Sequence, residues 1–189
     1  MAYSAIDIAK KIVCKTDVEH GDTLSNLKLQ KLLYYMQGFH LAAFDTPFFN
    51  EAIEAWTYGP VVPVVFREFK KHQNRAINPE NYLDALALTG EEQQLFDRVY
   101  DKYNCFSAVA LMQMTHTEGP WKIHKVGEVL TRNEIRDYFT TLPLPDQTPV
   151  NAAPITFDET YMQNRIQQSA PAWKGIADAD AWIHELRGE

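Results

Sequence analysis

The segment from residue 25 to residue 44, SNLKLQKLLYYMQGFHLAAF, constrains the fold more than any other part of this 189-residue chain. Its apolar residues recur at three- and four-residue intervals and cover more than half of a helix circumference; they are Leu29, Leu32, Leu33, Met36, Phe39 and Phe44. A helix that is apolar over so much of its surface has to be enclosed by other elements. The segment therefore predicts the central helix of a bundle.

Helix-start signals predict the elements around it. Four hydroxyl residues each precede an acidic residue by three positions, in the pairs Ser4–Asp7, Thr89–Glu92, Thr131–Glu134 and Thr156–Glu159. Such a pair can satisfy backbone N–H groups of a first helical turn. Together with the apolar periodicity, these signals predict a mainly α fold, a compact helical bundle, with helices over residues 4–16, 25–44, 60–72, 89–104, 107–116, 131–140, 156–168 and 178–187.

A short β element is predicted between the second and third of these helices, near residues 48–58. Residues 48–56 alternate weakly between apolar and polar, which is typical of a short strand or an extended arm. Tyr58, Gly59 and Pro60 predict a turn, and Pro60 suits the first position of the next helix. The β-branched valines that follow, at 61–65, could instead continue a strand.

A Pro-rich stretch divides the chain into predicted parts. The sequence TTLPLPDQTPVNAAP has four prolines in fifteen residues and no periodicity, as in a linker. We therefore predict a helical domain at residues 1–142, a linker at 143–154 and a conditionally helical tail at 155–189. From residue 146 to the end there are seven acidic and three basic residues, a charge of −4, so less than a quarter of the chain holds more than half of its net charge of −7.

The overall charge and hydropathy exclude some functions. A net charge of −7 disfavours wide contact with nucleic-acid phosphates, which requires a basic surface, and it fits a basic partner. No apolar run approaches the roughly 18 residues of a membrane span. The N-terminal sequence MAYSAIDIAKK lacks the layout of a secretory signal, so we expect a cytoplasmic protein that does not contact a membrane.

No pattern of catalytic or metal-binding residues stands out. His116, Glu118 and His124 are spaced H-x-E-x5-H, which is not a known zinc pattern, and Gly119-Pro120 breaks the helix between them. We expect His116 and Glu118 to cap a helix end and to orient the turn around Trp121. Cys105 lacks a nucleophile signature, and the glycines form no phosphate-binding loop. We therefore predict no enzymatic activity, no cofactor and no metal site.

Three blocks of sequence are similar to the signature of the Panacea (SocA-like) antitoxin domain family. They are NLKLQKLLYY at 26–35, EAWTYGPV at 54–61, and the set Met114-Thr115-His116 followed by Pro120-Trp121. The resemblance implies a single helical domain that is not an enzyme. It also implies an antitoxin, which neutralises a cognate protein toxin encoded by the adjacent gene through direct contact. The alternative within the family is an adaptor that delivers a toxin to a cytosolic protease.

The tail has a resemblance of its own. Residues 169–188 are similar to the C-terminal segments of small bacterial antitoxins, which run roughly W-GI-D-D-WL-LRG and are disordered until they wrap a toxin. This resemblance implies a toxin-binding tail with the contact residues Trp173, Ile176, Trp182, Ile183, Leu186 and Arg187. A segment this short cannot bury such large apolar groups alone. In the alternative interpretation, the tail folds back on its own domain as a terminal helix.

The aromatic residues of the family blocks allow two interpretations. Either they pin the turns against the central helix, or they line a domain groove that receives the toxin; the residues are Tyr34, Tyr35, Trp56, Tyr58 and Trp121. Lys28, Lys31, Lys70 and Lys71 predict a modest basic patch. Operator DNA binding by that patch is disfavoured by the overall charge but stays open, as does the oligomeric state.

Overall fold

A computed structural model describes residues 2–19, 21–73 and 75–145, all of which belong to one unit, residues 1–148. The described part is mainly helical with a small three-stranded sheet, so the predicted fold class is confirmed. The helices predicted at 156–168 and 178–187, the tail and most of the linker lie outside the described residues. The elements run in the order α1 (Ala5–Cys14), α2 (Asn26–Phe44), β1 (Ile53–Trp56), β2 (Gly59–Val61), α3 (Pro63–Phe69), η1 (Lys70–His72), η2 (Pro79–Asn81), α4 (Gly90–Asn104), α5 (Ala108–Thr117), α6 (Gly119–Lys122), β3 (Val129–Leu130) and α7 (Arg132–Thr140).

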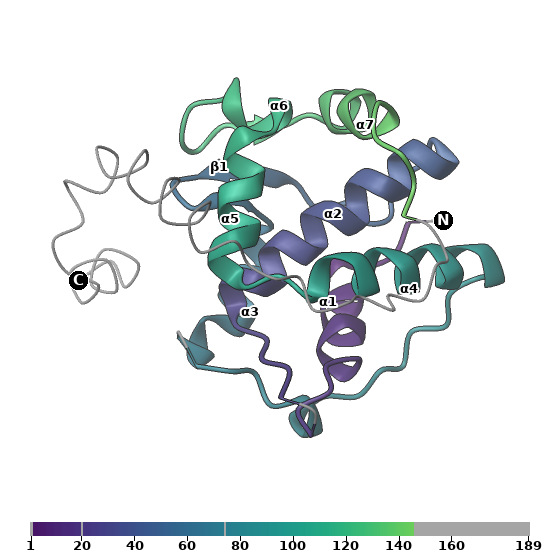
Figure 1. Ribbon diagram of the computed structural model, residues 1–189, viewed down its shortest axis with the longest axis vertical. Helices are drawn as coiled ribbons and strands as arrows, with labels where there is room; N and C mark the ends of the chain where they lie inside the picture. Colours follow the sequence, from purple (N-terminus) through teal and green to yellow (C-terminus); the bar gives the residue numbers. More distant parts are fainter. Residues whose placement is uncertain (1, 20, 74, 146–189) are drawn as a thin grey trace, which may run out of the picture. The chain divides into compact units, whose positions relative to one another are not determined.

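Helix α2 is the centre of the unit, as its composition predicted. It contacts α1, α3, α4, α5, α7 and strand β2, and Figure 1 shows it running through the middle of these elements. The Ser25 side chain accepts a hydrogen bond from the Lys28 amide at its start, and Asp45 ends it in a left-handed conformation with φ 55°. Its apolar side chains are buried on several faces, because a neighbouring helix covers each of them.

Gly38 of α2 lets α7 approach closely. A Cβ atom at this position would overlap the ring of Phe139 on α7. The Phe139 ring also packs edge-on against Tyr34 and Phe39, with centroid distances of 5.3 and 4.9 Å. The contact between α2 and α7 therefore depends on a missing side chain at Gly38.

The small sheet has the strand order β2-β1-β3, and both pairings are antiparallel. Trp56 pairs with Gly59, whose φ of +95° suits the hairpin turn. Pro60 lies inside β2, so its predicted place at the start of a helix is wrong; α3 begins three residues later, at Pro63. Side chains of α2 hold the intervening segment extended, because Gln30 Oε1 accepts from the Val62 amide and Lys31 Nζ donates to the Pro60 carbonyl.

The second half of the unit follows the predicted caps. Thr89–Glu92 and Thr131–Glu134 form complete capping boxes at the starts of α4 and α7. The Gly119-Pro120 pair follows the end of α5, as predicted. The same pair also begins the short helix α6, which was not predicted from the sequence. Pro120 fits there because a first helical turn needs no N–H from that residue. In the described part of the chain, no helix combines the length and apolar character that crossing a bilayer needs.

Candidate functional site

The three sequence blocks meet around one buried polar cluster. Lys31 comes from α2, the Gly59–Pro60 pair from the hairpin, and Thr115 from α5. Lys31 is fully buried, and its Nζ donates to the Pro60 carbonyl at 2.9 Å. A Cβ on Gly59 would lie 2.7 Å from Nζ and 2.6 Å from Thr115 Oγ1, so only glycine fits against this cluster.

Lys31 places an ionisable amino group in the interior of the domain. It forms no ion pair with any described residue, and the loss of hydration on burial lowers the pKa of its ammonium group to about 7. Lys28, one turn earlier, is also buried and donates from Nζ to the Asn104 carbonyl at 2.7 Å. Both lysines therefore lie in the interior of the domain and donate to backbone carbonyls there. The predicted basic patch of Lys28, Lys31, Lys70 and Lys71 does not exist as one surface, since only Lys70 and Lys71 are exposed.

Glu118 is a buried acid elsewhere in the same interior. It ends α5 and precedes α6, and its Oε1 accepts a hydrogen bond from the Tyr35 hydroxyl at 2.7 Å. Burial raises the pKa of this carboxyl group. Tyr35 also stacks on Tyr103 of α4 with a centroid distance of 3.9 Å. The Tyr35 side chain thus links α2 to α4 and to the junction of α5 and α6.

Tyr34 and Tyr35 have no exposed surface. Their rings pack against each other and against Phe139 of α7. In this structure they pin α2 to its neighbours, which was one of the two interpretations of the family aromatics. They offer no surface to a docking partner, so the structure leaves only Trp56, Tyr58 and Trp121 of the predicted groove residues at partly exposed positions.

Trp56 and Trp121 lie together at the edge of the cluster. Trp121 Nε1 donates to the Trp56 carbonyl at 3.0 Å, and its indole stacks on the His116 ring with a centroid distance of 4.0 Å. Trp56 Nε1 donates to Glu54 Oε2 at 2.9 Å, and its ring meets Phe66 of α3 edge-on. The Trp121 indole ties α6 to the hairpin, the Trp56 indole packs the hairpin against α3, and both remain half-buried.

The residues that resembled a catalytic or metal set are separated by these contacts. His116 stacks on Trp121, Glu118 bonds Tyr35, and His124 lies between Glu128 and Glu134. Among the described residues, no group of three or more His, Cys, Asp and Glu is arranged to hold a metal ion. Burial raises the pKa of the Cys105 thiol, which disfavours the reactive thiolate.

An exposed apolar loop follows α6, and the sequence reading did not single it out. It spans residues 123–129, from the end of α6 to the first residue of β3, and is called the 123–129 loop. Ile123 and Val126 are each 67% exposed, and Val129 is 48% exposed. Their spacing of three resembles the buried face of a helix, but Gly127, with φ +91°, turns the chain here. That glycine, six residues after Trp121, is the signal that could have identified a loop.

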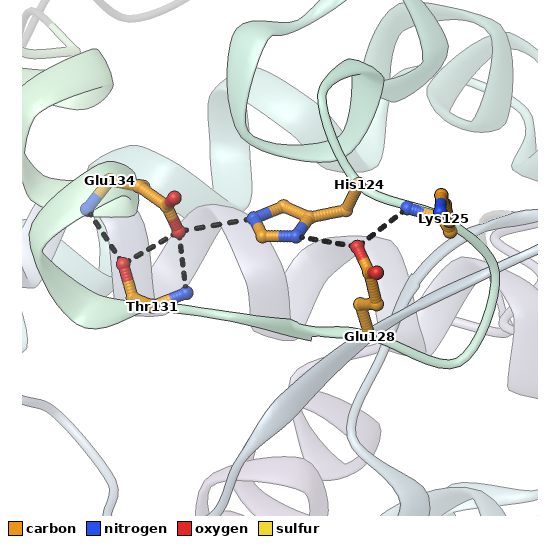
Figure 2. A network of polar contacts seen from close by, with 5 residues as sticks. All are labelled: His124, Lys125, Glu128, Thr131 and Glu134. Atoms are coloured by element: carbon orange, nitrogen blue, oxygen red, sulfur yellow. Dashed lines mark hydrogen bonds and ion pairs between the residues drawn. The ribbon is translucent and has the colours of Figure 1, made fainter.

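The 123–129 loop is held in place by polar contacts (Figure 2). His124 lies between two carboxylates, with Nδ1 3.3 Å from Glu128 Oε2 and Nε2 3.1 Å from Glu134 Oε2. The same Glu128 oxygen accepts from the Lys125 amide at 2.9 Å. Two backbone hydrogen bonds join the loop to Ala55 of β1. The Gly127 amide donates to the Ala55 carbonyl, and the Ala55 amide donates to the Glu128 carbonyl.

Residues 29–122 match the family of SocA-like antitoxins, Panacea domain. The chain carries a SocA-like Panacea domain. It is 35% identical over 111 residues to Antitoxin SocA of Caulobacter vibrioides (strain NA1000 / CB15N), and the match takes in 53% of this chain and 59% of that relative. No solved structure matches the chain. The Panacea domain ends at Lys122, so it contains both indoles and the buried cluster, and the 123–129 loop follows it directly.

The family match does not reach the predicted tail contacts. Trp173, Ile176, Trp182, Ile183, Leu186 and Arg187 lie outside the residues that the structure describes and outside the Panacea domain. The toxin-binding role of these residues stays a prediction from the sequence. Within the described part of the chain, the candidate interaction site is the surface formed by Trp56, Trp121 and the 123–129 loop.

Proposed function

We propose that this chain is the antitoxin of a bacterial toxin–antitoxin system and that it neutralises a cognate protein toxin by direct contact. The observation that carries this proposal is the SocA-like Panacea domain at residues 29–122, together with the 35% identity to Antitoxin SocA. The toxin is encoded by the adjacent gene, and the complex forms in the cytoplasm.

The chemistry of the domain supports a binding function without catalysis. The polar residues of the family blocks are engaged in holding α2, the hairpin and α6 together. Cys105 bonds the Lys102 carbonyl, and burial disfavours its thiolate. In contrast, the exposed aliphatic side chains of the 123–129 loop are of the kind that mark protein–protein contacts.

Growth rescue tests the proposal. The reading frame adjacent to this one is induced alone, with the full chain, and with residues 1–142. We expect the neighbour to arrest growth and the full chain to restore it. Rescue by the full chain only would assign decisive contacts to residues 143–189, whereas rescue by both would assign them to the Panacea domain. A toxic neighbour that neither form rescues would contradict the proposal.

The cellular level of the toxin distinguishes direct neutralisation from proteolytic delivery. A protein that blocks the toxin leaves its level unchanged or raises it. An adaptor for a protease lowers it. We expect immunoblots of the tagged neighbour to show an unchanged or higher level during rescue; a fall that depends on a cytosolic protease would assign the adaptor mechanism instead.

A further inference from the structure

Three segments that lie far apart in the sequence meet at one carboxylate, that of Glu92 at the start of α4. The Tyr3 hydroxyl donates to Glu92 Oε2 at 2.6 Å, and the Tyr3 amide donates to the Phe48 carbonyl at 2.8 Å. The same Glu92 oxygen accepts from the Thr89 amide at 3.0 Å in the capping box of α4. His40, near the end of α2, approaches the second oxygen, with Nε2 3.5 Å from Glu92 Oε1. Glu92 therefore links the N-terminal segment, α2 and α4.

The Glu92 carboxylate is charged wherever histidine titrates. Burial raises the pKa of Glu92, but hydrogen bonds from Tyr3 and Thr89 outweigh burial and lower this pKa to about 2. An ordinary histidine takes up its second proton at about pH 6.5. A negative charge is therefore present beside His40 Nε2 throughout the pH range in which the imidazole can become charged.

The contacts of the His40 ring determine which nitrogen carries hydrogen in the neutral form. Its Nδ1 lies 2.8 Å from the Thr46 carbonyl, which can only accept, so the hydrogen is on Nδ1. Neutral imidazole has a single N–H, so Nε2 presents a lone pair. This nitrogen is buried, has no hydrogen-bond partner among the described residues, and lies beside the Glu92 carboxylate, which is also an acceptor. A second proton, on Nε2, would convert this contact between two acceptors into an ion pair.

Aromatic packing holds the His40 ring in this orientation. The ring stacks on Phe48 with a centroid distance of 4.6 Å and contacts Phe44 at 4.7 Å. Only 3% of the His40 surface is exposed. A rotation that turned Nε2 away from Glu92 would also break the hydrogen bond to Thr46. A proton taken up by His40 therefore has one place to bind and one carboxylate to face.

Burial and Glu92 change the pKa of His40 in opposite directions. Burial is the larger effect and lowers this pKa, the Thr46 carbonyl and Glu92 raise it, and the amino terminus lowers it least of all. Because the net pKa is lowered, His40 is neutral at pH 7 and takes up its second proton in more acidic solution. Removing the charge of Glu92 would leave the effect of burial less opposed, so the pKa of His40 should fall further.

We infer that His40 and Glu92 form a pH-dependent contact between α2 and α4, in which acid places a proton on His40 Nε2 and the imidazolium pairs with the Glu92 carboxylate inside the folded domain. The N-terminal segment is coupled to this contact, because Tyr3 bonds the other oxygen of the same carboxylate. The inference goes beyond the proposed antitoxin function and does not depend on a partner protein.

An NMR titration of His40 in the full chain tests the inference, with the His40 signals assigned from a His40→Gln variant. In Glu92→Gln we expect the pKa of His40 to fall by about one unit or more. Glutamine also serves in a capping box, so this variant keeps the start of α4. Glu91→Gln is the matched control, because Glu91 is exposed and precedes Glu92 on the same helix. In this control the pKa of His40 should remain at its wild-type value.

The nitrogen chemical shifts of the His40 ring give a second measurement, on the wild-type chain. We expect hydrogen on Nδ1 and none on Nε2 at pH 7. Hydrogen on Nε2 at that pH would mean that the ring already donates to Glu92, and it would overturn the inference. An unchanged pKa of His40 in folded Glu92→Gln, or an equal fall in Glu91→Gln, would also overturn it. The wild-type measurement decides the question if the Glu92 variant does not fold.

Discussion

At the scale of single residues, the Panacea domain buries ionisable groups that most proteins keep in water. Glu118 lies in the interior with the Tyr35 hydroxyl as its hydrogen-bond partner, and Lys31 lies there with only a backbone carbonyl. Removing a charge from water costs free energy unless an opposite charge compensates it. Each of these groups is therefore held more favourably in its neutral form, which makes the stability of the domain depend on pH.

The variant Glu118→Gln tests the raised pKa of Glu118. Burial raises the pKa of Glu118 in the folded state, so the folded protein holds this proton more tightly than the unfolded chain. The resulting stabilisation is complete below pH 4.5 and is lost as pH rises through the raised pKa. We expect the wild type to lose stability relative to the glutamine variant as pH rises from 4.5, by about 1.4 kcal/mol for each unit of raised pKa. Urea unfolding of both proteins across this range measures the difference; a constant difference would contradict the shift.

The variant Lys31→Met tests the lowered pKa of Lys31, and here stability changes with pH in the opposite direction. Burial lowers the pKa of Lys31 to about 7, so between pH 7 and 10 the unfolded chain binds more protons than the folded one. Stability in this range rises with pH, by at most about 1.4 kcal/mol per pH unit. We expect the wild type to gain stability relative to the methionine variant from pH 7 to pH 9 in urea titrations. Parallel curves for the two proteins would show that Lys31 is hydrated.

At the scale of elements, packing of α7 on α2 depends on Gly38. Alanine is a better helix former than glycine, so Gly38→Ala would stabilise an isolated helix. In this domain the added methyl group would overlap the Phe139 ring. We expect a net loss of about 1–3 kcal/mol of unfolding free energy, measured by chemical denaturation.

A smaller partner should relieve this overlap. In the double variant Gly38→Ala/Phe139→Leu, we expect the alanine to cost less than it does in the wild-type background, a coupling that a double-mutant cycle measures. Gly90→Ala is the control, because a Cβ there meets no atom within 4 Å. Additive effects of the two substitutions would contradict a direct contact between positions 38 and 139.

The same scale explains what the sequence could predict. Apolar periodicity and capping residues located the main helices to within a few residues, because both signals are local. The start of α3 was wrong at Pro60, since side chains of α2 hold that segment in a strand. Helix α6 was missed because four residues carry no periodicity. Long-range contacts decide both cases, and no local pattern contains them.

The candidate site was predicted less well than the fold, for a related reason. Tyr34, Tyr35, Lys28 and Lys31 are polar or amphipathic residues on a helix, and such residues are usually partly exposed. In this chain α2 is covered on all sides, so these side chains turn inward, and Lys28, Lys31 and Tyr35 bond the backbone or Glu118. Trp56 and Trp121 do remain at the surface. Only the packing of the whole unit distinguishes the two groups.

At the scale of the whole molecule, the proposed function combines two contacts with one toxin. The first lies on the Panacea domain, and the second is the predicted tail at residues 155–189. Two contacts joined by a chain reinforce each other, because binding of one holds the other at a high effective concentration. The affinity of the full chain should then exceed that of either part by orders of magnitude.

Changing the distance between the two contacts tests this arrangement. Inserting twelve Gly/Ser residues after residue 148 doubles the predicted linker of residues 143–154. For a linker without contacts of its own, a doubling costs about 0.6 kcal/mol, or roughly threefold in affinity. Removal of residues 143–189 should cost far more, because it deletes one contact entirely. Calorimetry with the purified neighbour compares the three proteins. A large loss on insertion would mean that residues 143–154 themselves contact the toxin, and equal affinity of residues 1–142 and the full chain would confine binding to the Panacea domain.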